Sequence, residues 1–427
     1  MNVQAPAAPR RRALEAAAVV STALALRLAF IAVAAGPFNP KSLRNDAAQY
    51  QSYAVHMVEQ GRYADDAGDL AFRMPGYPVL LALVYFAWGH ASILPVLVLQ
   101  ALLGALACLA LYAAAQKLYG RPWGLCCGIA AAISYDLIEP AGRILTESPS
   151  SALVCLFLAL WFLAPWRPAL LAAVLGALLG ALTLIRAEFG FFAAAFFLLS
   201  PALAKAWRPR HAIAGAAVFA AFLSPWIVRN ALVLHRFAPG CDDGPYALER
   251  GLLEPLENLG DRDVSQRPPD PAGSEVALSA LRLRRFKSVL RETSLFKVLR
   301  AYAFNGASLF YPFLPQFDWT YVLFVPFWLF ALVRFREHPE LSVVWLMAGL
   351  YVFIHLFFGP ASRFREPIAA PLLLAGAAGA RDAWTRWGRT FAGWAAGYAA
   401  ADIAVWMFAP QARLGVLWLK RTLLGAP

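Results

Sequence analysis

Arginine and carboxylate side chains lie close to the ends of apolar segments in five separate parts of the sequence. They are Asp46 with Arg73, Arg143 with Glu147, Arg186 with Glu188, Arg229 alone, and Arg363 with Arg365. Arginine binds phosphate through two parallel hydrogen bonds, and a carboxylate beside it can accept a proton from a reacting hydroxyl. These residue types are therefore suited to a reaction of a phosphorylated compound.

Each of these residues also has a purely structural interpretation. Asp46 opens a helix-like stretch, so an N-cap explains it as well as an active-site carboxylate does. Glu147 suits the first turn of a helix, and Arg73 can reach lipid headgroups along its aliphatic stem. Arg186 and Glu188 can pair with each other. The functional interpretation therefore depends on whether these residues meet on one side of a membrane.

The composition requires a membrane. Of the 427 residues, 60% are hydrophobic and only 15% are charged. This much apolar side chain exceeds what a soluble core of that size can bury, and long apolar runs indicate helices instead of an outer-membrane barrel. The sequence therefore predicts an all-α polytopic membrane protein embedded in a lipid bilayer.

Eleven apolar segments are candidate membrane spans. They cover 14–35, 94–118, 123–140, 149–165, 168–185, 189–204, 212–228, 319–334, 341–358, 366–380 and 390–409. The first follows three arginines, yet it is too long and lacks a suitable cleavage site for a signal peptide, so we expect a retained helix with a cytoplasmic N-terminus. Arg27 interrupts it and either faces the bundle or snorkels.

The segments suggest three regions. Residues 1–234 form an N-terminal transmembrane region with a first outer loop at 36–93, residues 235–318 a second outer region, and residues 319–427 the C-terminal helices. The apolar stretches 77–88 and 299–314 are expected to lie at the outer interface.

Basic residues occupy the turns that this topology makes cytoplasmic. They are Lys117, Arg121, Arg167, Lys205, Arg208, Arg210, Arg334, Arg336, Arg381, Arg386 and Arg389. Orientation and lipid headgroups thus explain much of the formal net charge of +12, and no nucleic-acid partner is expected. The exception is the C-terminal tail, whose Arg413, Lys420 and Arg421 fall on the outer side.

No cofactor is expected. The six histidines show no metal-ligand spacing, and phosphate-loop and dinucleotide-binding motifs are absent. Asp65, Asp66 and Asp69 form an acidic cluster that suits a divalent cation less well than a solvated loop face.

The order of the motifs resembles the bacterial polyprenyl-phosphate-dependent glycosyltransferases of the GT-C superfamily, of the protein O-mannosyltransferase-like and aminoarabinose-transferase-like kind. The similarity covers nearly the whole chain. It lies in Asn45-Asp46-Ala47-Ala48-Gln49-Tyr50, Arg73-Met74-Pro75-Gly76-Tyr77-Pro78, Leu145-Thr146-Glu147, Pro225-Trp226-Ile227-Val228-Arg229-Asn230 and Ser362-Arg363-Phe364-Arg365-Glu366-Pro367.

The resemblance implies a GT-C-like bundle in the bacterial inner membrane with a periplasmic active site. The donor would be a sugar on a polyprenyl phosphate, typically undecaprenyl phosphate, and the acceptor a glycan, lipid or protein. Asp46 matches the catalytic carboxylate of the family, and the substrate-binding candidates are Arg73, Tyr50, Tyr77, Glu147, Arg186, Glu188, Arg229, Arg363 and Arg365. Inversion by single displacement is implied; related families differ in metal use.

Two departures from the family pattern limit this assignment. Ala47 follows Asp46 where some relatives have a second acid, and Phe364 and Glu366 replace the usual residues of the late motif. The sequence therefore leaves open whether Arg363 or Arg365 faces the phosphate. A transporter of lipid-linked sugars is the alternative function, although transport predicts charged or broken helices near the midplane. A non-catalytic scaffold would not need Asp46.

Overall fold

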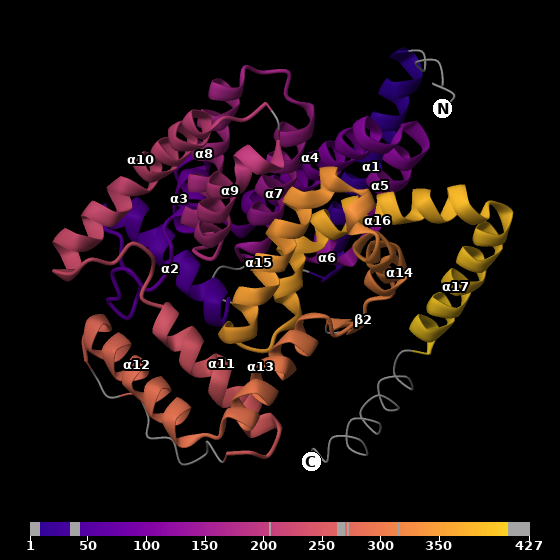
Figure 1. Cartoon of the computed structure of the whole chain (residues 1–427). Coiled ribbons are helices and arrows are strands. Elements are labelled where there is room, and N and C mark those ends of the chain that lie inside the picture. The colour runs from indigo at the N-terminus through magenta and orange to yellow at the C-terminus, as the bar shows by residue number, and fades with distance from the viewer. Residues whose placement is uncertain are drawn as a thin grey trace.

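The protein is helical and has the architecture of a polytopic membrane protein, as the sequence predicts (Figure 1). The computed structural model describes residues 9–34, 43–204, 206–262, 270, 273–314 and 316–408. Lys205 and the basic residues of the C-terminal tail lie outside the described residues.

The elements follow one another as helices with short connections. Helices α1 to α10 are Pro9–Ala34, Asn45–Gln60, Gly76–Trp88, Ile93–Tyr119, Arg121–Ile133, Tyr135–Ile138, Glu147–Leu163, Pro168–Ile185, Phe189–Leu203 and Pro209–Leu234, with the 3-10 turn η2 at Glu139–Gly142. Helices α11 to α17 are Gly244–Asn258, Glu275–Glu292, Leu295–Leu309, Trp319–Val333, Ser342–Phe358, Glu366–Trp387 and Arg389–Met407. The 3-10 turns η3, η4 and η5 are Phe335–Glu337, Pro339–Leu341 and Ser362–Arg365, and strands β1 (Phe313–Leu314) and β2 (Gln316–Phe317) pair antiparallel.

A helix is present at each of the eleven predicted spans, but their lengths differ. Among the described residues, five helical segments are long and apolar enough to cross a membrane, namely those of α1, α4, α8, α10 and α15. A sixth span results if α5 is joined to α6 and η2 across a bend of 67°. Helices α7, α9 and α14 are apolar but shorter. The count of eleven spans remains a prediction.

Helix α16 is the centre of the bundle. Every residue from Glu366 to Gly379 is buried, and many of them are alanine or glycine. Small side chains allow neighbouring helices to approach closely, which is how helices associate in a membrane where burial from water contributes little. Helix α16 accordingly contacts α4, α5, α7, α14, α15 and α17.

Arg27 faces the bundle interior and does not snorkel. Its side chain is fully buried and donates hydrogen bonds to the carbonyl oxygens of Ala23 and Ala132 and to the sulfur of Cys108. Ala132 lies in the last turn of α5, where carbonyl groups lack partners within the helix. Arg27 therefore stabilises the bend between α5 and α6.

Helices α11, α12 and α13 form a layer at one end of the bundle, and the N-terminus lies at the opposite end (Figure 1). Helix α11 joins this layer to the bundle by direct backbone contact with α15. A Cβ atom at Gly251 would overlap the carbonyl oxygen of Phe357, so only glycine permits this approach. Asn305 of α13 donates hydrogen bonds of 2.7 Å to the carbonyl oxygens of both Gly251 and Leu356.

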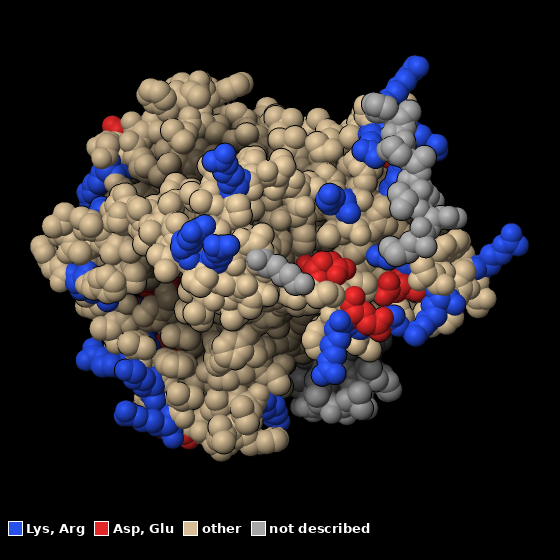
Figure 2. Space-filling model, turned by 45° about the horizontal axis from the view of Figure 1, so that its top comes forward, with Lys and Arg blue, Asp and Glu red and all other residues tan. Residues whose placement is uncertain are grey.

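Figure 2 turns the upper end of the molecule toward the viewer. Lys and Arg side chains occur there in several separate groups, whereas Asp and Glu gather mainly in one region. This surplus of basic side chains agrees with the turns that the sequence makes cytoplasmic. The orientation itself remains a prediction.

We predict that Gly251→Ala displaces α11 and lowers stability by about 1–3 kcal/mol, the usual range for overpacking a tight contact. Thermal unfolding in detergent measures this loss. The matched control is Gly349→Ala in α15, where nothing lies within 4 Å of the added Cβ, and there we expect no loss. Equal unfolding temperatures for both variants would contradict the tight contact at Gly251.

Candidate active site

Two adjoining cavities lie between the bundle and the α11–α13 layer. The large cavity has a volume of about 940 Å³ and the small cavity about 350 Å³. Six residues line both cavities and form their boundary: Asp46, Arg73, Leu145, Tyr246, Arg250 and Arg363. Asp46 is therefore accessible from both sides.

Asp46 lies in the first turn of α2 and is not the N-cap of this helix. The N-cap position belongs to Arg44, and Asn45 adopts φ 51°, a left-handed conformation that asparagine tolerates better than most residues. The Asp46 carboxylate instead pairs with two arginines. Its Oδ1 lies 2.7 Å from Nη2 of Arg73, and its Oδ2 lies 2.7 Å from Nη2 of Arg363.

The two arginines set the charge state of Asp46. Burial disfavours the ionised carboxylate, but the positive charges of Arg73 and Arg363 outweigh burial and lower the pKa of Asp46. The position of Asp46 at a helix N-terminus also suits an anion. Asp46 is therefore ionised at neutral pH in the ligand-free protein.

Arg73 is held in place by groups from two other segments, helix α2 and the turn before α11. Besides Asp46, it donates to Oδ2 of Asp243 at 3.0 Å and to Oε1 of Gln49 at 2.6 and 3.0 Å. Arg73 reaches these partners from the loop that precedes α3. At the start of α3, Gly76 packs so closely on α8 that a Cβ added there would lie 2.7 Å from the backbone carbonyl group of Leu184. The site thus depends on the close contact between α3 and α8.

Arg363 and Arg365 point in different directions from the same 3-10 turn, η5. Arg363 lines both cavities, whereas Arg365 lines neither and is fully buried. The Arg365 guanidinium binds Asp136 through two hydrogen bonds of 2.8 and 2.9 Å and lies 3.1 Å from Asp318. Arg365 also lies over the ring of Tyr321 and donates to the carbonyl oxygen of Tyr311 at 2.9 Å, so each of its three guanidinium nitrogens has a partner within the protein.

A second arginine–carboxylate cluster forms the wall of the small cavity. Arg186 donates to Glu188 at 2.6 Å and to the hydroxyl of Thr146 at 3.1 Å, and it lies 3.4 Å from Glu147. The predicted pairing of Arg186 with Glu188 is thus present, yet both residues also line the cavity. Tyr50 lines the same cavity.

Two further sequence candidates, besides Arg365, lie outside the cavities. Tyr77 is buried and donates to Gln100 at 2.8 Å, and its ring packs edge-on against Tyr50. Arg229 donates to the carbonyl oxygens of Leu70 and Tyr63 at 2.5 and 3.1 Å and thereby attaches the first loop to α10. Arg365, Tyr77 and Arg229 support residues of the site without reaching either cavity.

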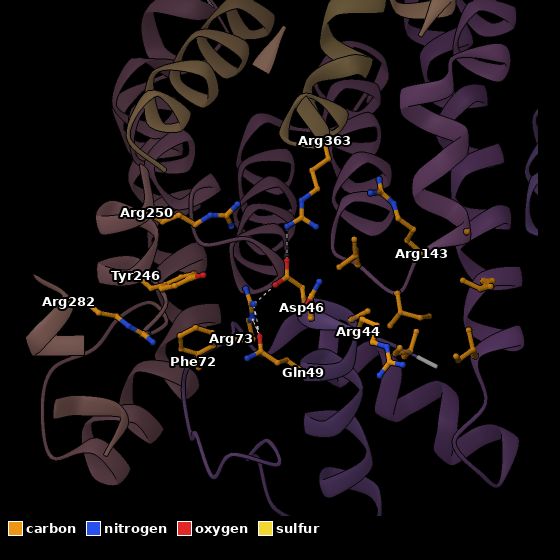
Figure 3. Close-up of a pocket in the computed structure, with 18 residues that line it drawn as sticks. Arg44, Asp46, Gln49, Phe72, Arg73, Arg143, Tyr246, Arg250, Arg282 and Arg363 are labelled. Carbon is orange, nitrogen blue, oxygen red and sulfur yellow. Dashed lines mark hydrogen bonds and ion pairs between the residues drawn. The ribbon is translucent and has the colours of Figure 1, made fainter. Parts of the chain in front are cut away.

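The large cavity is rich in arginine (Figure 3). Its arginines are Arg44, Arg73, Arg143, Arg250, Arg282 and Arg363, and Asp46 is the one carboxylate residue in its lining. Leu43, Ile93, Leu97 and Ile144 add an apolar portion to the wall. A cavity that combines cations with aliphatic side chains suits an amphiphile with an anionic headgroup.

Sequence reasoning missed the contribution of α11 and α12. Tyr246, Arg250 and Arg282 line the large cavity, and the Arg282 guanidinium stacks on the Tyr246 ring at 4.8 Å. These residues lie in a polar segment without long apolar runs, so the sequence offered no basis for predicting where they lie relative to the membrane helices. Gln49 lies in the same sequence motif as Asp46 and Tyr50, and Glu366 follows Arg365, yet neither Gln49 nor Glu366 was predicted as a site residue.

The structure shows no preformed metal site among the residues that it describes. No group of three or more His, Cys, Asp or Glu residues there is arranged to hold a metal ion. The acidic loop residue Asp65 instead accepts hydrogen bonds from the backbone of Ala67 and Asp69 and so stabilises a turn.

Solved structures with the same arrangement of helices identify the fold. The chain aligns with the oligosaccharyltransferase of Archaeoglobus fulgidus in complex with zinc and sulfate, with a TM-score of 0.55, 15% identity and coverage of 90% of this chain and 51% of that one. The same enzyme, named AglB, in complex with an inhibitory peptide and dolichol phosphate aligns with a TM-score of 0.50 and 13% identity, over 91% and 54% of the two chains. The chain has a GT-C fold.

The GT-C fold agrees with the resemblance expected from the sequence motifs. ArnT from Cupriavidus metallidurans bound to undecaprenyl phosphate is also similar, with a TM-score of 0.42, 14% identity and coverage of 86% of this chain and 78% of that one. The chain spans about half the length of the archaeal oligosaccharyltransferase. No protein-family model matches the sequence, and no curated protein matches it.

We predict that Arg365→Met destabilises the protein far more than Arg363→Met. Removing Arg365 leaves Asp136 and Asp318 buried without their cation, which typically costs about 3–5 kcal/mol, whereas Arg363 is partly exposed and its ion pair contributes about 0–1 kcal/mol. Thermal unfolding in detergent measures both losses. Adding Asp136→Asn to Arg365→Met should restore part of the stability, and equal losses for the two single variants would contradict the structural role of Arg365.

Proposed function

We propose that the protein is a membrane glycosyltransferase that moves a sugar from a polyprenyl-phosphate donor to an acceptor hydroxyl. The observation that carries the proposal is the position of Asp46, which lies between two cavities and pairs with two arginines. The GT-C fold supports the reaction class, and dolichol phosphate and undecaprenyl phosphate are bound by the AglB and ArnT structures. The acceptor is a glycan, a lipid or a protein.

In the proposed reaction the acceptor oxygen attacks the anomeric carbon as the bond from that carbon to the phosphate oxygen breaks. The bonding electrons leave with the phosphate, and the hydroxyl proton passes to the Asp46 carboxylate. A single displacement of this kind inverts the anomeric configuration. Arg363 and Arg73 stabilise the charge that develops on the phosphate, which is a preorganised electrostatic role.

The large cavity is the proposed site of the donor phosphate and the first part of its lipid. Its arginines bind the phosphate, and its apolar wall contacts the prenyl chain. Arg363 is the better candidate for phosphate contact than Arg365, because Arg363 lines the cavity and Arg365 is already bound by two carboxylates. A transporter would not require a carboxylate poised at the boundary of two cavities.

The proposed location is the bacterial inner membrane, with both cavities open toward the periplasm and the N-terminus in the cytoplasm. The basic residues at the opposite end of the bundle support this orientation (Figure 2). Cysteine labelling at Lys117 and at Arg282, read with a membrane-impermeant reagent in intact cells, tests it. Labelling at position 282 without labelling at position 117 is the expected result.

We predict that Asp46→Asn abolishes sugar transfer while the protein stays folded and still binds donor. The amide has the shape of the carboxylate but accepts no proton at neutral pH, so a loss of about 100-fold or more is expected. Transfer from a synthetic polyprenyl-phosphate sugar is measured in detergent, with thermal unfolding as the control for folding. Full activity of this variant would refute the role of Asp46 as the base, and lipid movement across vesicles without transfer would indicate a transporter.

The pH dependence should differ between kcat/KM and kcat. In the free protein the arginines lower the pKa of Asp46, so the acid limb of kcat/KM should lie below about 4, the usual aspartate value. A bound phosphate neutralises Arg73 and Arg363, which raises the pKa of Asp46 and moves the acid limb of kcat to higher pH. If the acid limbs of kcat/KM and kcat fall at the same pH, the phosphate and Asp46 do not compete for the arginines.

A further inference from the structure

Glu147 presents a buried carboxylate oxygen without a partner at the edge of the small cavity. It lies at the start of α7, its side chain is 4% exposed, and it lines this cavity. One oxygen, Oε1, lies 3.4 Å from Nη1 of Arg186. The other, Oε2, is buried and has no hydrogen-bond partner among the residues that the structure describes. A buried acceptor left in this state is costly, so a ligand that donates a hydrogen bond there gains affinity.

A carboxylate oxygen of Asp243 in the same cavity also lacks a hydrogen-bond partner among the described residues. Asp243 uses Oδ2 to accept from Arg73, whereas its Oδ1 is buried and has no partner among the described residues. Asp243 lies next to the N-terminus of α11 and lines the same cavity as Glu147. Two carboxylate oxygens from different segments thus lack hydrogen-bond donors among the described residues of one cavity.

The remaining lining indicates what kind of ligand the space fits. Four carboxylates line it: Asp46, Glu147, Glu188 and Asp243. Four arginines and the rings of Tyr50, Phe191, Tyr246, His355, Phe358 and Phe364 complete the wall. Because so many carboxylates repel an anion, a phosphate is better accommodated in the large cavity, where Asp46 is the one carboxylate residue in the lining. A compact ring that carries several hydrogen-bond donors fits the small cavity.

We infer that the small cavity binds the glycosyl group of the donor and that Glu147 selects it by accepting a hydrogen bond from a ring hydroxyl or amine. This inference rests on the proposed function and assigns the sugar to one of its two cavities. The anomeric carbon then lies at the boundary, beside Asp46, with the phosphate on the side of the large cavity. Arg186 holds the Glu147 carboxylate in position through Oε1 and leaves Oε2 for the sugar.

The apolar residues support this division between the cavities. Leu43, Ile93, Leu97 and Ile144 line only the large cavity and can contact a prenyl chain. The small cavity is near the lower limit of volume for ligand sites, and its polar residues Glu147, Arg186 and His355 are buried. It therefore suits one sugar unit better than a lipid or a polypeptide.

The test compares Glu147→Gln and Glu147→Ala with the unaltered full-length protein in detergent. A panel of synthetic polyprenyl-phosphate sugars first identifies a transferred donor, and monodeoxy versions of that donor are then assayed. Loss of a hydrogen bond to a buried charge should lower kcat/KM for the donor by about 10- to 100-fold in Glu147→Ala. The KM of the acceptor should not change.

The deoxy donors provide a measurement that does not depend on the folding of a variant. With the unaltered protein, one deoxy donor should show a kcat/KM lower than that of the full donor by about the factor that Glu147→Ala causes. With Glu147→Ala, the same deoxy donor and the full donor should show nearly equal kcat/KM, because the substitution and the deoxy change remove the same contact. If the contacted group is an amine, Glu147→Gln should lose as much as Glu147→Ala and an N-acetylated donor should not be transferred. If it is a hydroxyl, the glutamine variant should keep part of the activity.

The control is Glu337→Gln, the same change at an exposed glutamate paired with Arg334 in the connection between α14 and α15, outside both cavities. It should leave donor and acceptor kinetics unaltered. The inference is overturned if Glu147 variants change the acceptor KM instead of the donor kinetics, or if no deoxy donor is coupled to Glu147. Failure of the unaltered protein to transfer any sugar would instead refute the proposed function.

Discussion

The end of the bundle next to the α11–α13 layer depends on arginines that are each shared by two carboxylates from different segments. Arg73 binds Asp46 and Asp243, Arg143 binds Glu139 and Glu366, Arg186 binds Glu147 and Glu188, and Arg365 binds Asp136 and Asp318. A buried charge needs a partner, so each arginine fixes two segments relative to each other. The irregular ends of α5, α7, α8, α14 and α15 are held together in this way, where helix packing alone would leave their loops free.

This sharing also determines where an additional anion can bind. Arg365 is fully buried between two carboxylates and lines neither cavity, so its charge is not available to a phosphate there. Among the residues that the structure describes, Arg363 forms an ion pair with Asp46 alone, and Arg250 of α11 and Arg282 of α12 add further guanidinium groups to the lining of the large cavity. In the proposed reaction, the donor phosphate binds in the large cavity and competes with Asp46 for Arg363. On that proposal, donor binding and activation of the Asp46 base are coupled through the Arg363 guanidinium group.

Much of this arrangement follows from the sequence, and the remainder has identifiable physical reasons. Apolar length predicted the helices, and the alternation of spans predicted that Asp46, Glu147, Arg186 and Arg363 would share one side. The sequence could not separate Arg363 from Arg365, because in a single 3-10 turn the direction of a side chain depends on its neighbours, here Asp136 and Asp318. Tyr246, Arg250 and Arg282 were missed since a polar amphipathic segment carries no signal of which surface it will cover.

The contact at Gly251 determines how the wall of the large cavity can change. The backbone of helix α11 contacts the backbone of α15, and Asn305 donates a hydrogen bond to a carbonyl oxygen of each helix. These contacts hold the wall in position without using the side chains that line the cavity. Residues such as Tyr246 and Arg250 can therefore be exchanged without moving the helix that carries them. The α11–α13 layer therefore contributes to the large cavity in two separable ways: its backbone contact with α15 sets the position of the wall, and its side chains set the chemistry of the wall.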